Sequence, residues 1–359
     1  MHRKLNTTLF LSAAILALTS CTGMSDATDD ATRQGVTISL CTQPSLNTRT
    51  TLTSDRNVQH VSQVQLYVFD GTSDNATCVA SEDTGWDPTG AAGGLPTREQ
   101  TYKLKYTGFK PQSTYTLIAV GSDDASLRTY QPLSIGTTLS QARATATTIA
   151  TRHDIAQSEL FGGSLNMTMN DEGGFEGTID LYRRVAGVLV SLVNIPSYIE
   201  TDGTRHTVAK LSLQLYTQQN RSTPLASNNI TADPLTSTDA TENEANRTVL
   251  EIAQSEVQRS TNLTEKGAYL LPIAAPTDSD TPTLSLVFAD SDGNTLRTLP
   301  VKLVETTTDS DGNKTTTKRT AYPILANQLY KIEANFDTET QITIEVEPAF
   351  EGRHEFDVI

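Results

Sequence analysis

The sequence predicts an all-β protein, and three observations support this fold class. The 359-residue chain contains 57 threonines, a β-branched residue that favours strands and keeps exposed sheet faces soluble without adding charge. Apolar and polar residues alternate in many segments, as in a strand with one face in a core and the other in water. Asp-Gly turns join some of these segments, and patterns typical of helices are rare.

The first 20 residues predict export. A basic start precedes Leu9–Leu18, an apolar run of about ten residues that is too short to cross a bilayer core of about 30 Å as a helix. A signal peptide, residues 1–20, is therefore favoured over a membrane anchor. Leu18-Thr19-Ser20-Cys21 has the form of a lipobox, so we predict a lipoprotein in which Cys21 carries a diacylglycerol containing palmitate. The alternative is a chance cysteine beside an ordinary cleavage site.

Residues 21–35 form a small, polar and acidic segment that cannot build a core. We predict that it is a flexible tether between the lipid and the folded body. Its aspartates, Asp26, Asp29 and Asp30, resemble the surface-export signal of Bacteroidales lipoproteins, and a generic solvated linker explains them equally well.

Predicted strands follow along the body of the chain. Val36–Leu40 is a short β-branched and apolar run, and Val61–Asp70 alternates before an Asp-Gly turn. Leu211–Leu215, Tyr330–Phe336 and Ile342–Val346 alternate in the same way. The best helix candidate, over residues 139–149, is rich in threonine and is at most a short crossover, and residues 217–247 are predicted to form a polar surface loop.

The run Leu181–Val193 is too long for one strand of about five or six residues. We predict that the last strand of one sandwich runs directly into the first strand of the next. This places one β-sandwich domain at residues 36–184 and a second at residues 185–359.

Two copies of the sequence Asp-Ser-Asp-Gly-Asn, at Asp290–Asn294 and Asp309–Asn313, lie between alternating runs. They predict the turns of an antiparallel meander over residues 283–324, because glycine accepts the positive φ of such turns. They also resemble half of a calcium loop, but they lack its third aspartate and a bidentate glutamate at the proper offset. We therefore interpret them as hairpin turns.

Two cysteines remain after Cys21. Cys41 and Cys78 could form one disulfide in an exported protein, closing a loop of about 38 residues that the chain-entropy model values at about 4 kcal/mol. We predict this bridge because adjacent strands could bring the two residues together. The alternative is two unpaired buried thiols.

Composition and motifs exclude several function classes. The formal charge is −15, with 42 acidic and 27 basic residues, which argues against nucleic acid and against docking on anionic lipid. The five histidines are scattered, and no nucleophile elbow or phosphate-binding loop occurs, so we expect no enzyme, no metal site and no cofactor. The pair Asp123-Asp124 is interpreted as a solvated turn.

Several motifs fall in an order that resembles the Bacteroidales fimbrillin superfamily, most closely the FimB-like accessory and anchor subunits of type V fimbriae. After lipobox Cys21 they are Val61–Asp70 (VSQVQLYVFD), Leu117–Asp124 (LIAVGSDD), Glu159–Ser164 (ELFGGS), Leu181–Val190 (LYRRVAGVLV) and Asn327–Phe336 (NQLYKIEANF). The resemblance spans nearly the whole mature chain. It implies two tandem transthyretin-like β-sandwiches and a lipid anchor in the outer membrane. It also implies a structural role in surface fimbriae, as a minor anchor or tip component, and adhesion to host or bacterial surface ligands.

The resemblance also implies pilus assembly by strand exchange with other fimbrial subunits. Val36–Leu40 would be the strand that an arginine-specific protease removes after Arg49 or Arg56, and its loss would open a groove, expected against Val61–Phe69. The alternative is that both are ordinary surface arginines of an anchor that keeps this strand and its lipid. We expect Ile342–Val346 and Phe356–Ile359 to close their own sandwich, so that the protein receives a strand, or caps an end, rather than donates a strand.

The rival function is a surface glycan-binding lipoprotein of a nutrient-uptake system. Such a protein needs an exposed aromatic platform, and Trp86, the only tryptophan, lies in a Gly/Pro-rich segment where it could supply one. An enzyme ranks third.

Overall fold

The computed structural model describes residues 35–42, 61–88, 99–122, 132–144, 159–220, 223, 225, 247–257, 264–308, 314–336 and 342–347. Almost all regular structure in these ranges is strand, which confirms the all-β prediction. The two helices described are α1 (Leu139–Ala144) and α4 (Gln254–Val257). Neither has the length and apolar character that a membrane crossing requires.

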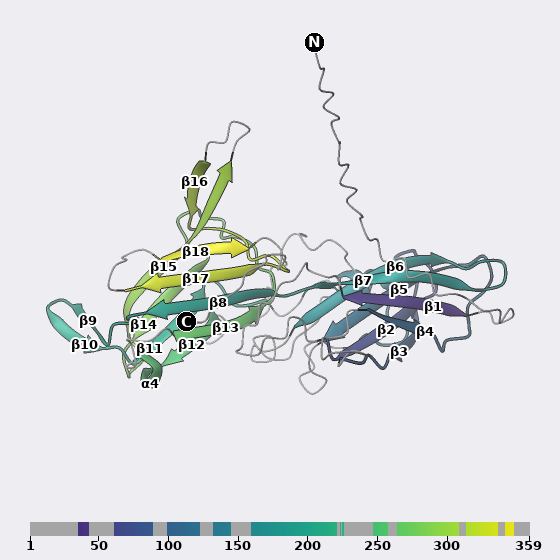
Figure 1. The fold of residues 1–359 in the computed structure, drawn as a ribbon, viewed down its shortest axis with the longest axis horizontal. Coiled ribbons are helices and arrows are strands. Elements are labelled where there is room, and N and C mark those ends of the chain that lie inside the picture. Colours follow the sequence, from purple (N-terminus) through teal and green to yellow (C-terminus); the bar gives the residue numbers. More distant parts are fainter. Residues whose placement is uncertain are drawn as a thin grey trace, which may run out of the picture. The chain divides into compact units, whose positions relative to one another are not determined.

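The first sheet has seven strands in the order β3-β2-β5-β6-β7-β1-β4 (Figure 1). Neighbouring strands are antiparallel except β1 and β7, which are parallel. Their bounds are β1 Val36–Thr42, β2 Gln63–Phe69, β3 Cys78–Asp83, β4 Glu99–Lys103, β5 Thr114–Ser122, β6 Leu160–Thr168 and β7 Phe175–Arg183.

The second sheet has nine strands, in the order β12-β11-β14-β15-β18-β17-β8-β13, with β16 paired to β15. Two of its pairs, β15 with β18 and β17 with β8, are parallel. The bounds are β8 Ala186–Val193, β11 Lys210–Leu215, β12 Thr248–Ala253, β13 Thr264–Leu270, β14 Leu284–Ala289, β15 Thr295–Thr308, β16 Lys314–Arg319, β17 Leu329–Asn335 and β18 Ile342–Glu347. A separate ribbon consists of β9 (Tyr198–Thr201) and β10 (Thr204–Thr207).

The long apolar run Leu181–Val193 is divided between two strands, as its length predicted. Strand β7 ends at Arg183 in the first sheet, and β8 begins at Ala186 in the second sheet. Because only two residues separate them, the chain passes from one sheet to the other with almost no connecting loop. The division into two transthyretin-like domains at residues 36–184 and 185–359 stays a prediction.

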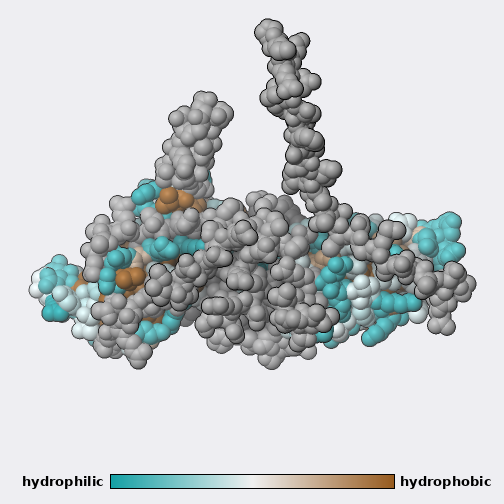
Figure 2. All heavy atoms as spheres, viewed as in Figure 1, coloured by the Kyte–Doolittle hydropathy of each residue, from teal (hydrophilic) through white to brown (hydrophobic). Residues whose placement is uncertain are grey.

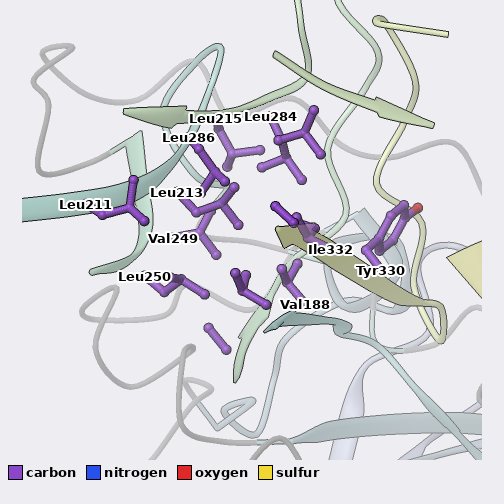
Figure 3. Packing of buried hydrophobic residues seen from close by; sticks show 14 of the residues in the cluster. Val188, Leu211, Leu213, Leu215, Val249, Leu250, Leu284, Leu286, Tyr330 and Ile332 are labelled. Atoms are coloured by element: carbon purple, nitrogen blue, oxygen red, sulfur yellow. The ribbon is translucent and has the colours of Figure 1, made fainter. Parts of the chain in front are cut away.

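The apolar positions of the alternating segments form the cores. In the second sheet, leucines of β11 and β14 (Leu211, Leu213, Leu215, Leu284 and Leu286) pack with Val188, Tyr330 and Ile332 (Figure 3). All of them are at most 1 % exposed. The described residues visible in Figure 2 are mostly hydrophilic, with apolar side chains in small patches, as expected when one face of each strand faces water.

The first Asp-Ser-Asp-Gly-Asn copy is the turn between β14 and β15. The Asp290 carboxylate accepts hydrogen bonds from the backbone N–H groups of Asp292 and Asn294 at 2.9 and 2.8 Å, and Gly293 has a φ of +85°. The hairpin interpretation is therefore confirmed for this copy. The second copy and most of residues 217–247 lie outside the described residues, as does the end of the predicted helix, and α1 covers only Leu139–Ala144.

Candidate functional site

The first strand, β1, lies between two other strands of the first sheet. It pairs in parallel with β7 over seven residues, from Val36 opposite Phe175 to Thr42 opposite Leu181. On its other side it pairs antiparallel with β4, from Thr37 opposite Lys103 to Cys41 opposite Glu99. Both edges of β1 are thus satisfied by hydrogen bonds within the sheet.

The side chains of β1 alternate between the core and the surface. Val36, Ile38 and Leu40 are at most 1 % exposed and belong to the core cluster of the first sheet, whereas Thr37 and Ser39 are half-buried. Removal of β1 would uncover an apolar groove between β4 and β7 and leave the facing backbone groups of both strands without partners. Groups of this kind cost about 1–3 kcal/mol each when they are kept from water.

The expected position of this groove was wrong. The sequence placed it against Val61–Phe69, which forms most of β2, but β2 pairs with β3 and β5 and has no contact with β1 in the sheet order. Adjacent segments of a chain often pair, and that tendency suggested β2. Instead, β1 pairs in parallel with β7, a strand that lies about 140 residues further along the chain.

The predicted processing sites lie in the connection between β1 and β2. Arg49 and Arg56 are in residues 43–60, which are outside the described residues, as is Cys21. In chain order, Cys21 and β1 precede both arginines, and all of β2–β18 follows them. Cleavage after either arginine would therefore break the covalent link of Cys21 and of β1 to the remaining body.

The predicted disulfide is absent: Cys41 and Cys78 are both buried, and their sulfur atoms are not bonded to each other. Cys41 lies in β1 and Cys78 begins β3, and four strands, β2, β5, β6 and β7, separate them in the sheet order. The prediction assumed that the strands carrying the two cysteines are adjacent, which they are not. Cys78 packs instead against Tyr67, Phe69 and Ile118 in an apolar cluster.

Trp86 is not an aromatic platform. Its side chain is 5 % exposed and belongs to the core cluster of the first sheet. The residue on which the glycan-binding rival depended is therefore a core residue. The Asp123-Asp124 pair lies outside the described residues.

The last described strand, β18, closes its own sheet. It pairs antiparallel with β17, from Leu329 opposite Glu347, and in parallel with β15, from Val301 opposite Ile342. This confirms the expectation for Ile342–Val346, while Phe356–Ile359 lie outside the described residues.

A buried polar cluster that no sequence pattern predicted lies where residues of both sheets meet. Glu159, 1 % exposed, faces Arg183 at 2.7 Å between Oε1 and Nη2, and the Tyr269 hydroxyl of β13 donates to the same Oε1 at 2.9 Å. Arg184 donates to the Gly162 carbonyl at 2.8 Å, and burial lowers its pKa to about 10. Surrounding apolar residues also come from both sheets, among them Leu160, Leu189, Leu271 and Leu329.

Within the described ranges, the acidic, histidine and cysteine side chains form no cluster that could hold a metal ion. The candidate functional site is therefore the position of β1 in the first sheet. This apolar strand is hydrogen-bonded to β4 and β7, and a segment that contains Arg49 and Arg56 connects it to β2. Its chemistry is that of strand pairing, which supports recognition of another strand.

Comparisons with solved structures return fimbrial and adhesion proteins of low sequence identity. A candidate cell adhesion protein from Bacteroides eggerthii is 12 % identical, with 88 % of this chain and 95 % of that chain covered and a TM-score of 0.44. The tip fimbrial protein Mfa3 from Porphyromonas gingivalis is 11 % identical, with 88 % and 98 % covered and a TM-score of 0.38. The fimbrial anchor protein Mfa2 from the same organism is 12 % identical, with 81 % and 99 % covered and a TM-score of 0.37.

A comparison with curated proteins gave no match. The family model described as fimbrillin-A associated anchor proteins Mfa1 and Mfa2 matches residues 28–351, which is most of the chain and includes every strand from β1 to β18. The chain belongs to this family of fimbrillin-A associated anchor proteins.

Proposed function

We propose that this structural subunit of surface fimbriae takes its place in the fimbrium through the β1 position of its first sheet. As a member of the anchor family, it acts in the fimbrium at the cell surface, in association with other fimbrial subunits and in adhesion. The finer proposal is that the groove between β4 and β7 accepts a strand of another subunit when β1 has left. It receives a strand and does not donate one.

One observation carries this proposal: β1 is bonded on both sides and yet is the strand nearest the N-terminus, with no earlier strand among the described residues. Such a strand can leave without breaking the connection between any other two strands. Its apolar face, Val36, Ile38 and Leu40, defines what a replacement must supply, namely apolar residues at every second position.

We also propose that the protein is a lipoprotein held in the outer membrane through Cys21, and that it is not an enzyme. The lipid and β1 lie on the same side of Arg49 and Arg56 in the chain. An anchor that stays on the membrane would therefore keep β1 and remain uncut, whereas a subunit cut after Arg49 or Arg56 would open its groove and lose its direct link to the lipid.

The experiment is mass spectrometry of the mature protein from cells, with a matched variant in which Arg49 and Arg56 are both lysine. An acylated N-terminal Cys21 would identify the anchored form, and a start at Thr50 or Asn57 would identify the open form. In the open form, we expect a complex with another subunit that resists mild denaturant, and the lysine variant should not form it. Cleaved protein that stays monomeric beside the other subunits would contradict strand replacement at β1.

Lipidation has its own test. Cys21→Ala should abolish palmitate labelling and release the protein from the outer-membrane fraction, because no thiol remains to carry the lipid. Cys78→Ser is the control for loss of a cysteine and should keep the label. Unchanged labelling and membrane association of the Cys21→Ala protein would refute the lipoprotein proposal.

A further inference from the structure

A groove of about 560 Å³ lies along the second sheet. Its volume is within the range of about 300–1,000 Å³ that is usual for ligand sites. The groove is lined by residues of β11, β14 and β15, by Arg247 directly before β12, and by Thr281 and Pro282 before β14.

The register of the strands explains the floor of the groove. Leu284 and Leu286 of β14 point into the core (Figure 3), so the alternate residues Ser285 and Val287 lie on the other face. Ser285 is opposite Gln214 of β11, and Val287 is opposite Thr298 of β15. The floor therefore extends across three neighbouring strands.

The groove is elongated along the strands. Its lining runs from Thr281, before β14, to Thr295, which is near the other end of the strand pair, opposite Ala289. The stretch from Leu284 to Ala289 alone spans about 17 Å of extended chain. A ligand that fills the groove is thus longer than a single small anion.

Among the described residues of the lining, Arg247 is the single charged one and none is an aspartate or glutamate, although the protein carries a formal charge of −15. Its Nε donates to the Leu215 carbonyl at 3.1 Å, which holds the guanidinium in place. This is the one hydrogen bond found for the Arg247 side chain in the described part of the chain, so its two terminal NH₂ groups can serve a ligand. A guanidinium presents paired donors that match a carboxylate.

The other groups of the lining suit a sugar. Ser285, Thr295 and Thr298 provide hydroxyls, which both donate and accept hydrogen bonds as sugar hydroxyls do. The Tyr216 ring supplies an apolar surface, and its hydroxyl is held by a hydrogen bond to the Ala274 carbonyl at 3.0 Å. A simple phosphate or carboxylate ion would leave most of these groups unused.

We propose that this groove binds an acidic oligosaccharide, with a sugar carboxylate on Arg247 and neighbouring rings along the hydroxyls of β14 and β15. The proposal adds a ligand class to the adhesive role of the subunit. It does not depend on strand replacement at β1, so either proposal can fail while the other holds.

The test is isothermal titration of the full mature chain with trigalacturonic acid and with its methyl ester, which has the same rings but no charge. We expect the acid to bind at least about tenfold more tightly than the ester, since a hydrogen bond to a charged group is worth about tenfold or more. Arg247→Gln should remove about the same factor. Arg205→Gln, a matched change in β10 outside the groove, should leave the affinity unchanged.

Two further variants keep Arg247 intact and guard against a folding defect of Arg247→Gln. Ser285→Ala and Thr298→Val should each weaken binding of the acid about threefold to tenfold, and they should leave incorporation into fimbriae unchanged. Equal binding of acid and ester, or no binding of the acid, would overturn the proposal. Preferential binding of an acidic peptide over trigalacturonic acid, with the same sensitivity to Arg247→Gln, would overturn it as well and assign the groove to a protein partner.

Discussion

Burial decides the chemistry of individual residues in this protein more than their place in sequence motifs does. Cys78 sits in an apolar cluster, and its burial raises the pKa of the thiol above its usual value. A thiol with a raised pKa is protonated at neutral pH and reacts slowly, because the thiolate is the nucleophile. Trp86 is also buried. It lies in a Gly/Pro-rich segment, yet its side chain is part of the core of the first sheet.

We predict that Cys41 and Cys78 are both alkylated in denatured protein that has not been reduced. In the native protein, alkylation of Cys78 should be slower by at least about tenfold, since both its pKa and its burial oppose reaction. The measurement is mass spectrometry after timed treatment with iodoacetamide, with Cys78→Ser as control. Denatured protein that takes up no label without reductant would show that the two cysteines are bridged.

The Asp290 turn makes stability depend on pH. Hydrogen bonds, first from the Asn294 side chain and then from backbone N–H groups, favour the carboxylate and lower the pKa of Asp290 below its usual value. A group with a lowered folded pKa stabilises the fold above its unfolded pKa of about 3.9, and this contribution is lost as the pH falls through the folded pKa.

Asp290→Asn should therefore lower the unfolding temperature at about pH 6, and the difference from wild type should shrink as the pH falls toward about 2.5. Thermal unfolding followed by circular dichroism across this range measures it. The matched control is Asp292→Asn, whose carboxylate makes no such pair of backbone bonds in the same turn. A difference that does not vary with pH would mean that the Asp290 charge has no part in the effect.

At the scale of elements, the first and the last described strands occupy similar positions. β1 is parallel to β7 and antiparallel to β4, and β18 is parallel to β15 and antiparallel to β17. Each lies between two strands that do not pair with each other in the sheet order. A strand of equal pattern would therefore fit either position, and the predicted processing sites, Arg49 and Arg56, follow β1.

Truncation of the C-terminus tests whether β18 belongs to the fold of its own chain. A chain that ends at Asn335 lacks β18 and leaves β15 and β17 without their common neighbour, so we expect no folded monomer. A chain that ends at Phe350 retains β18, and deletion of residues 351–359 then tests whether Phe356–Ile359 also belong to the fold. Gel filtration and circular dichroism report the result. A stable monomer of the first truncated chain that fails to enter fimbriae would show that β18 serves a neighbour instead.

At the scale of the whole molecule, the Glu159–Arg183–Tyr269 cluster links residues of the two sheets. Two opposite charges with side chains 1 % and 2 % exposed stabilise each other, because the cost of taking a charge out of water is offset by a facing opposite charge. Tyr269 adds a hydrogen bond from a strand of the second sheet. The cluster therefore joins residues of the first and the second sheet through an ion pair and a hydrogen bond.

Glu159→Gln should destabilise the folded chain by about 3–5 kcal/mol, since it removes the charge that faces Arg183 while its shape is kept. Glu256→Gln is the matched control, because Glu256 pairs with Lys266 at 2.8 Å with both side chains about a third exposed, and should cost no more than about 1 kcal/mol. Urea unfolding of the mature protein measures both. Equal losses of unfolding free energy in the two variants would show that the buried Glu159–Arg183 pair stabilises the fold no more than the exposed pair does.

The sequence by itself determined the all-β class, the strands and the family. Alternation with a period of two is a local signal, and it placed β2, β11, β17 and β18 within one or two residues of their observed bounds. The Asp-Gly turn at Asp290–Asn294 likewise placed the hairpin of β14 and β15. The break between β7 and β8 also followed from length, because an apolar run of 13 residues is about twice as long as the usual strand of five or six.

Only the tertiary structure decided which strands are neighbours. Contacts between residues that are distant in the chain account for what the sequence missed. They include the pairing of β1 with β7, the packing around Trp86 and the cluster of Glu159, Arg183 and Tyr269. They also place Cys41 and Cys78 on strands that are not neighbours. No local pattern encodes such contacts, because they depend on how complete sheets pack and on which edges remain to be paired. The same holds for the groove at Arg247, whose floor exists only where three strands align.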